Sequence, residues 1–275
     1  TEYRYPDVTY KHNLSFKCGD LTFNLHHARG ETDDHTWIHV PEEKLIAPGD
    51  LFIWAVPNGG NPQKVQRYIS DWADALDEML KLDCEIFLPG HGFPILGKKR
   101  IKKALETTSK FLRSIEDQTL KLMNQGKSLN QVLHEVEIPN DLMELPWLTP
   151  IYDDPQFLIR MVWRRYGGWW DGEYDRLLPA PRKEEALAWV ELSSGIDNII
   201  LKALEYLDKG STKVAAQLIE TAFHADNNND QMHDARAKIY REFSLKQSSS
   251  MGRNILNHAS MASAQGKRDL AQTED

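Results

Sequence analysis

The chain has 275 residues, of which 41% are hydrophobic, enough for a real core in one to three domains. Its 33 basic residues are outnumbered by 41 acidic ones, so the net charge is −8, and no long basic run occurs, which argues against a nucleic-acid partner. No apolar stretch approaches the roughly 18 residues that span a bilayer, and the two cysteines, Cys18 and Cys84, are too few for a disulfide framework. We expect a soluble protein. The sequence does not fix its localisation and slightly favours the cytoplasm.

The first third of the sequence has the pattern of a small sheet. Strands are expected at residues 14–18, 21–25, 37–40, 45–47 and 85–88. Gly19-Asp20 is a two-residue hairpin turn between the first two strands. Asn61-Pro62 is typical of a helix start, and the apolar spacing that follows predicts one amphipathic helix from there to Leu80. A strand, a helix and a strand in this order indicate one layer pair of an αββα sandwich.

From Lys98 onward the pattern is helical. A long amphipathic helix is expected to end near Gly126, and Ser128 with Gln131 fits a capping box that opens the next helix. Further helices are expected at residues 156–166, 184–193, 196–208, 212–224 and 231–243. Residues 138–155 are expected to be an ordered connector. The segment from Gln247 is expected to fray, with one more helix as the alternative.

Three of the expected strands lead to residues that can bind a metal. Glu31 follows strand 21–25 within Gly-Glu-Thr-Asp-Asp-His-Thr, Asp50 follows strand 45–47, and His91 follows strand 85–88 within Pro-Gly-His-Gly. Neighbouring glycines let backbone and ligand approach closely, and carboxylate and imidazole both suit Zn²⁺. The set therefore indicates a metal site at strand ends, although each motif alone is also compatible with a polar loop or turn.

The ordered motifs resemble those of the metallo-β-lactamase superfamily. Residues 30–36 are similar to its Gly-His-Thr-x-Gly-His-Thr segment, with Glu31 in place of the usual metal-binding histidine. This glutamate, with residues 61–68 and 166–172, resembles the alkyl sulfatase branch. The resemblance implies an α/β plus α fold: the C-terminal half of an αββα metallo-β-lactamase sandwich, followed by an all-α helical domain.

The resemblance also implies roles at the metal site. It makes Glu31 a ligand of one zinc, Asp50 a bridge between two, and His91 a ligand of the second, with two Zn²⁺ per complete active site. His35 occupies a supporting position beside these ligands. A water activated by the metals would attack a sulfate ester.

One motif of the family is missing. Its first metal motif, His-x-His-x-Asp-His, occurs nowhere in the sequence, and the family places it well upstream of residues 30–36. We therefore expect that this chain lacks the first half of the hydrolase domain. Three ligands are too few for two metals, so the chain alone is expected to be inactive.

Substrate contacts are expected close to Asp50 in the sequence. Asn58, Lys64 and Arg67 could donate hydrogen bonds to sulfate oxygens, although a solvated helix face explains Lys64 and Arg67 equally well. The aromatic loop at 166–174 could contact an alkyl chain or a partner subunit, and the sequence leaves both open.

The domain division follows from the resemblance. We expect a partial hydrolase domain at 1–126, an all-α dimerisation domain at 127–246 and a frayed tail at 247–275. The expected partners are a small-molecule ester and a second copy, which makes a homodimer through the helical domain. Two alternatives stay open: a catalytically incomplete dimerisation or interaction module, and a hydrolase of another ester class.

Overall fold

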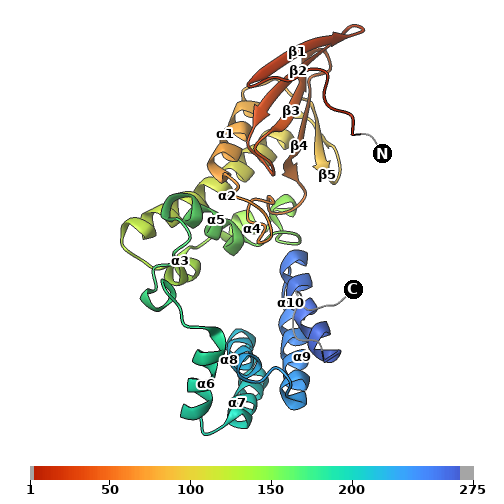
Figure 1. Cartoon of the computed structure of the whole chain (residues 1–275). Coiled ribbons are helices and arrows are strands. Elements are labelled where there is room, and N and C mark those ends of the chain that lie inside the picture. Colours follow the sequence, from red (N-terminus) through yellow and green to blue (C-terminus); the bar gives the residue numbers. More distant parts are fainter. Residues whose placement is uncertain (1–2, 267–275) are drawn as a thin grey trace. The chain divides into compact units, whose positions relative to one another are not determined.

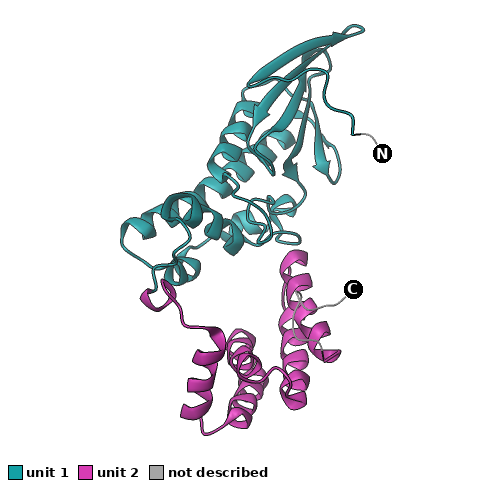
Figure 2. Cartoon of the chain, viewed as in Figure 1, with its two compact units in different colours: residues 1–173 teal, residues 174–275 magenta. Residues whose placement is uncertain are grey.

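The structure, a computed structural model of the chain, describes residues 3–266 (Figure 1). Its described part forms two compact units, which divide between Glu173 and Tyr174 (Figure 2). The first holds the sheet and the helices that pack on it, and the second consists of helices. The fold class expected from the sequence, a mixed sheet with helices followed by an all-helical region, is confirmed.

The sheet has six strands in sequential order. They are β1 (Asn13–Cys18), β2 (Leu21–Ala28), β3 (His35–Val40), β4 (Leu45–Ile53), β5 (Ile86–His91) and β6 (Ile95–Leu96). The pair β4–β5 is parallel and all other neighbours are antiparallel. All five expected strands are present. Two details differ: β4 is longer than expected and contains Asp50, and the two-residue β6 was not expected.

The start of the first helix differs from the sequence prediction. Helix α1 spans Ile69–Leu80, so the expected start at Asn61 is wrong. Asn61 only closes a turn, accepting a hydrogen bond from the backbone N–H of Gln63 at 3.0 Å. Beyond it, the side chain of Gln66 donates to the carbonyl of Met161 at 2.9 Å. Contacts with distant residues therefore hold this stretch in a loop and override its local helix signal.

The remaining helices of the first unit complete one hydrophobic core. They are α2 (Lys98–Asn124), α3 (Leu129–Glu135), α4 (Asn140–Met143) and α5 (Pro155–Gly167). The expected capping box of Ser128 and Gln131 is confirmed. Trp37 of β3, Trp72 of α1 and Leu158 of α5 all belong to the same buried cluster. Helices α3 to α5 thus pack in the first compact unit, while the domain boundary at 126/127 stays a prediction.

The second unit has a separate hydrophobic core. The helices of this unit are α6 (Arg182–Leu192), α7 (Ile196–Asp208), α8 (Thr212–Ala225), α9 (Asp230–Leu245) and α10 (Ser250–Ala264). Helix α10 lies within the stretch expected to be a tail and packs on α9, where Ser260 Oγ donates to the carbonyl of Ala237 at 2.8 Å. The end of that tail, residues 267–275, lies outside the described residues. Among the described residues, no helix is long and apolar enough to cross a bilayer.

Candidate functional site

The candidate residues all lie at one edge of the sheet. Because β2 and β4 are both antiparallel to β3, they run in the same direction, and β5 is parallel to β4. The carboxyl ends of these three strands therefore point the same way. Glu31 lies in the loop after β2, Asp50 in the second half of β4, and His91 at the last position of β5.

Asp50 and His91 form a pair that is open to solvent. His91 Nε2 lies 3.5 Å from Asp50 Oδ1, and the two side chains are 74% and 33% exposed. Asp50 is carried by an irregular stretch of β4 where Gly49 has φ +56°, a value that favours glycine. His35 Nε2 donates to the carbonyl of Pro48 at 2.9 Å, and its ring fills the space beside Gly49. His35 thus braces the backbone that carries Asp50.

Glu31 belongs to a different cluster, buried deeper. Asn58 Nδ2 donates to Glu31 Oε1 at 2.7 Å, and Arg67 Nη2 lies 3.3 Å from Glu31 Oε2. Asn58 and Arg67 are only 3% and 4% exposed, and Arg67 also donates to the carbonyl of Asn58. Lys64, the third substrate-contact candidate, is exposed. The structure therefore brings two of the three candidates to Glu31.

The same cluster contains polar atoms that are not satisfied by the protein. Among the described residues, Asn58 Oδ1 and Arg67 Nε are buried without a hydrogen-bond partner. A buried polar group without a partner is costly, so such groups usually bind a water, an ion or a ligand. The cluster can therefore offer further hydrogen bonds to a bound molecule.

Asp153, which the sequence did not single out, holds the loop that carries Asn58. Its side chain is fully buried and accepts hydrogen bonds from the backbone N–H groups of Gly60 and Asp154, both at 2.7 Å. Burial raises the pKa of Asp153 to about 7, although the two N–H groups and the nearby Arg67 oppose this shift. Asp153 and Gly60 are 93 positions apart in the sequence, so no local sequence pattern predicts their contact.

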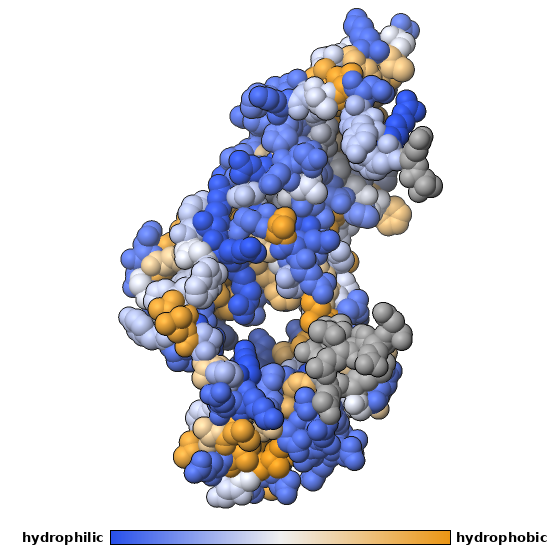
Figure 3. Space-filling model, in the orientation of Figure 1, coloured by the Kyte–Doolittle hydropathy of each residue, from blue (hydrophilic) through white to orange (hydrophobic). Residues whose placement is uncertain are grey.

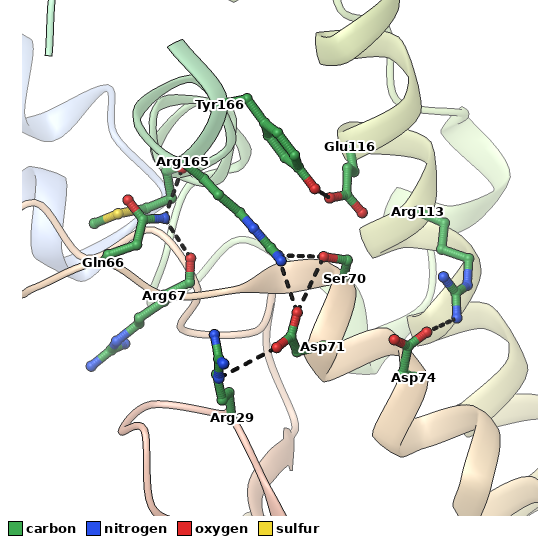
Figure 4. A network of polar contacts seen from close by, with 11 residues as sticks. Arg29, Gln66, Arg67, Ser70, Asp71, Asp74, Arg113, Glu116, Arg165 and Tyr166 are labelled. Carbon is green, nitrogen blue, oxygen red and sulfur yellow. Dashed lines mark hydrogen bonds and ion pairs between the residues drawn. The ribbon is translucent and has the colours of Figure 1, made fainter. Parts of the chain in front are cut away.

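A second polar network fixes the loop that leads to Glu31 (Figure 4). Arg29 Nε and Arg165 Nη1 both contact the carboxylate of Asp71, at 3.5 Å and 3.1 Å. Both guanidinium groups also lie over the ring of Tyr68, at 4.5 Å and 5.0 Å from its centre. Since Arg29 comes two residues before Glu31, this network ties the Glu31 loop to α1 and α5.

The described residues do not by themselves fit a binuclear zinc centre. No group of three or more His, Cys, Asp or Glu side chains among them is arranged to hold a metal ion. Asp50 and His91 lie together as a pair, while both carboxylate oxygens of Glu31 are engaged by Asn58 and Arg67. A four-coordinate zinc site needs more ligands than this pair provides.

Comparisons with known proteins point to one group. Residues 128–266 match the family described as "Alkyl sulfatase dimerisation". A linear primary-alkylsulfatase of Pseudomonas sp. (strain ATCC 19151) is 24% identical over 239 residues, covering 86% of this chain and 45% of that protein. The alkyl/aryl-sulfatase BDS1 of Saccharomyces cerevisiae is 27% identical over 183 residues, covering 66% of this chain and 28% of that protein.

The solved structures agree on the fold. The stereoselective inverting sec-alkylsulfatase Pisa1 from Pseudomonas sp. superposes with a TM-score of 0.90 at 23% identity, over 95% of this chain and 42% of that one. The chain thus spans less than half the length of the relatives described here. The resemblance to alkyl sulfatases that the motifs indicated is confirmed.

Proposed function

The chain belongs to the alkyl sulfatase dimerisation family, and from this premise we propose that it forms part of a binuclear zinc-dependent hydrolase of sulfate esters. The observation that carries the proposal is that the Asp50–His91 pair and the Glu31 cluster lie at the same edge of the sheet. The similarity to alkylsulfatases over most of this chain supports the substrate class. The activity belongs to the complete protein, because the described residues bring together too few ligands.

Each residue of the site has a distinct role in this proposal. Asp50 and His91 would offer a carboxylate oxygen and an imidazole nitrogen to a metal, and Glu31 would offer a carboxylate in place of its contacts with Asn58 and Arg67. Bound zinc would supply an activated water and polarise the ester oxygens. Arg67 and Asn58 are the donors for the sulfate group, since a guanidinium makes strong charge-assisted hydrogen bonds to such oxygens.

Metal content tests the proposal directly. In the complete protein, zinc measured by elemental analysis should fall at least about tenfold in Asp50→Ala and in His91→Ala, because each substitution removes one of the two paired metal ligands. His134→Ala, at an exposed position on α3, serves as the control and should keep the wild-type content. A complete wild-type protein without zinc would contradict the proposal.

Gly90 provides a test in which no candidate ligand is itself substituted. A Cβ added at Gly90 would lie well under 3.0 Å from Asp50 Oδ1, so the carboxylate of Asp50 rests directly on this glycine. Gly90→Ala should therefore displace the carboxylate from His91 and lower zinc retention as much as Asp50→Ala does. Leu88→Ala, at a partly exposed position of the same strand, is the control. Normal zinc retention in Gly90→Ala would show that the position of this carboxylate is unimportant.

A second candidate function is a dimerisation module without its own catalysis. It is favoured by the match of residues 128–266 to a dimerisation family and by the incomplete ligand set among the described residues. In either case we propose a homodimer formed through the helical region. Zinc retention together with sulfate ester hydrolysis by the complete protein would favour the hydrolase over this module.

A further inference from the structure

Two segments of the first unit that are distant in the sequence run side by side at the candidate site. Residues 54–71 lead from β4 into α1 and carry Asn58 and Arg67; we call them the site loop. Residues 147–165, which end within α5, are the support segment. Four hydrogen bonds between the two segments join residues that are 93 to 95 positions apart. The segments therefore run in the same direction with a nearly constant offset.

The middle of the site loop is bound to the support segment at two points. The backbone N–H of Gly60 donates to Asp153 at 2.7 Å. The side chain of Gln66 donates to the carbonyl of Met161 at 2.9 Å and to the carbonyl of Arg67 at 2.7 Å. Gln66 thus links α5 directly to the backbone of Arg67.

Arg165 of α5 holds the end of the site loop. Its Nη1 donates to Ser70 Oγ and, at 3.1 Å, to Asp71 Oδ1 (Figure 4). Its guanidinium also lies 5.0 Å from the centre of the ring of Tyr68, the residue that follows Arg67. Figure 3 shows mainly hydrophilic side chains on the surface of the first unit around α1 and α2. This agrees with polar contacts, rather than a hydrophobic patch, holding the end of the loop.

The contacts from α5 come from one face of the helix. Phe157, Met161 and Arg165 follow one another at intervals of four positions, which places them in one row along the helix. The backbone of Phe157 lies against Gly60, with no room for a Cβ between them. A single rigid element therefore contacts the site loop at several points along its length.

We propose that the support segment positions Asn58 and Arg67 for substrate, and that Arg165 is the positioning residue for Arg67. In the proposed function Arg67 gives up its contact with Glu31 to bind the sulfate group, so its backbone has to stay in place meanwhile. The residues on each side of Arg67 meet this need, because both contact α5. The support segment lies within residues 128–266. This part of the dimerisation-family segment would thus act at the substrate site of its own chain.

The inference rests on the proposed function, but its first test needs neither metal nor hydrolysis. Hydrogen–deuterium exchange in the complete protein, measured by mass spectrometry on peptides of the site loop, should be at least about tenfold faster in Arg165→Ala than in wild type. Arg164→Ala, at the neighbouring exposed position of α5, is the matched control and should exchange like wild type. Equal exchange in the two variants would overturn the inference.

Binding of inorganic sulfate then tests whether Arg67 itself is positioned. Calorimetric titration should give a dissociation constant at least about tenfold higher for Arg165→Ala than for Arg164→Ala. Circular dichroism verifies folding, and Gln66→Ala, which removes the bond to Met161, decides both measurements if Arg165→Ala unfolds.

An unchanged dissociation constant in the folded variant, together with loss of sulfate binding in Arg67→Ala, would overturn the role of Arg165. A wild type that does not bind sulfate would instead contradict the proposed role of Arg67 as a sulfate donor. The exchange comparison would still decide whether the support segment positions the site loop, so the two failures are distinguishable.

Discussion

Replacing Gly60 with alanine should destabilise the first unit by at least about 3 kcal/mol, the upper end of the usual range for overpacking a core. A Cβ at this position would lie well under 3.0 Å from backbone atoms of Phe157 and Leu158. These atoms belong to α5 and cannot move aside by changing a rotamer. The change should also disturb the Glu31 cluster, because Gly60 is held by Asp153 and lies two residues after Asn58.

Gly59 offers a closely matched control. The nearest atom to a Cβ there is the side-chain Cγ2 of Ile69, at 3.0 Å, which can shift by a small rotation. Both substitutions restrict the unfolded chain in the same way, so that contribution cancels in the comparison. Urea unfolding of wild type, Gly59→Ala and Gly60→Ala should show a loss of less than about 1.5 kcal/mol for Gly59→Ala. Equal losses in the two variants would show that the backbone contact with α5 is not the cause.

The parts of the fold that sequence predicts well are those set by local pattern. Alternating residues on each side of Gly19-Asp20 define the β1–β2 hairpin, and Ser128 with Gln131 defines the start of α3. The predicted helix start at Asn61 is wrong because tertiary contacts override the local pattern there. Its capping and proline signals are local, whereas Gln66 and Arg67 are held in the loop by residues distant in sequence. Tertiary contacts decide such a segment.

In the candidate site, too, the local sequence pattern predicts some features and tertiary contacts decide the others. Motif order indicates that Glu31, Asp50 and His91 lie near the ends of three strands, and in the structure these strand ends share one edge of the sheet. It does not predict that Glu31 pairs with Asn58 and Arg67 while Asp50 pairs with His91. Nor does it reveal Asp153, since an acidic residue before a helix is ordinarily a cap, the role that neighbouring Asp154 performs. Those features depend on how loops fold over one another.

Asp153 should make the stability of the first unit depend on pH. Burial raises its pKa from the ordinary 3.8 to about 7. Between these values the folded chain holds a proton that the unfolded chain has lost, so the free energy of unfolding falls as pH rises. The contribution is fully present below about pH 4 and is lost by about pH 7, and a shift of this size corresponds to about 4 kcal/mol.

The Asp153→Asn variant isolates this contribution, because every other titrating group is common to both proteins. The wild type minus variant difference in the free energy of unfolding, measured with urea, should fall by up to about 4 kcal/mol from pH 4 to pH 8. Asp154→Asn is the comparison variant, since asparagine caps a helix as well as aspartate does. Its difference should change less with pH than that of Asp153→Asn, because the Asp154 charge is only the smallest contribution to the raised pKa of Asp153. Parallel curves for wild type and Asp153→Asn would mean that the buried carboxylate is ionised throughout this range. In that case Arg67 and the N–H groups of Gly60 and Asp154 would stabilise the charge of Asp153 more than burial penalises it. The loop that carries Asn58 would then be held by an ionised carboxylate at every pH tested.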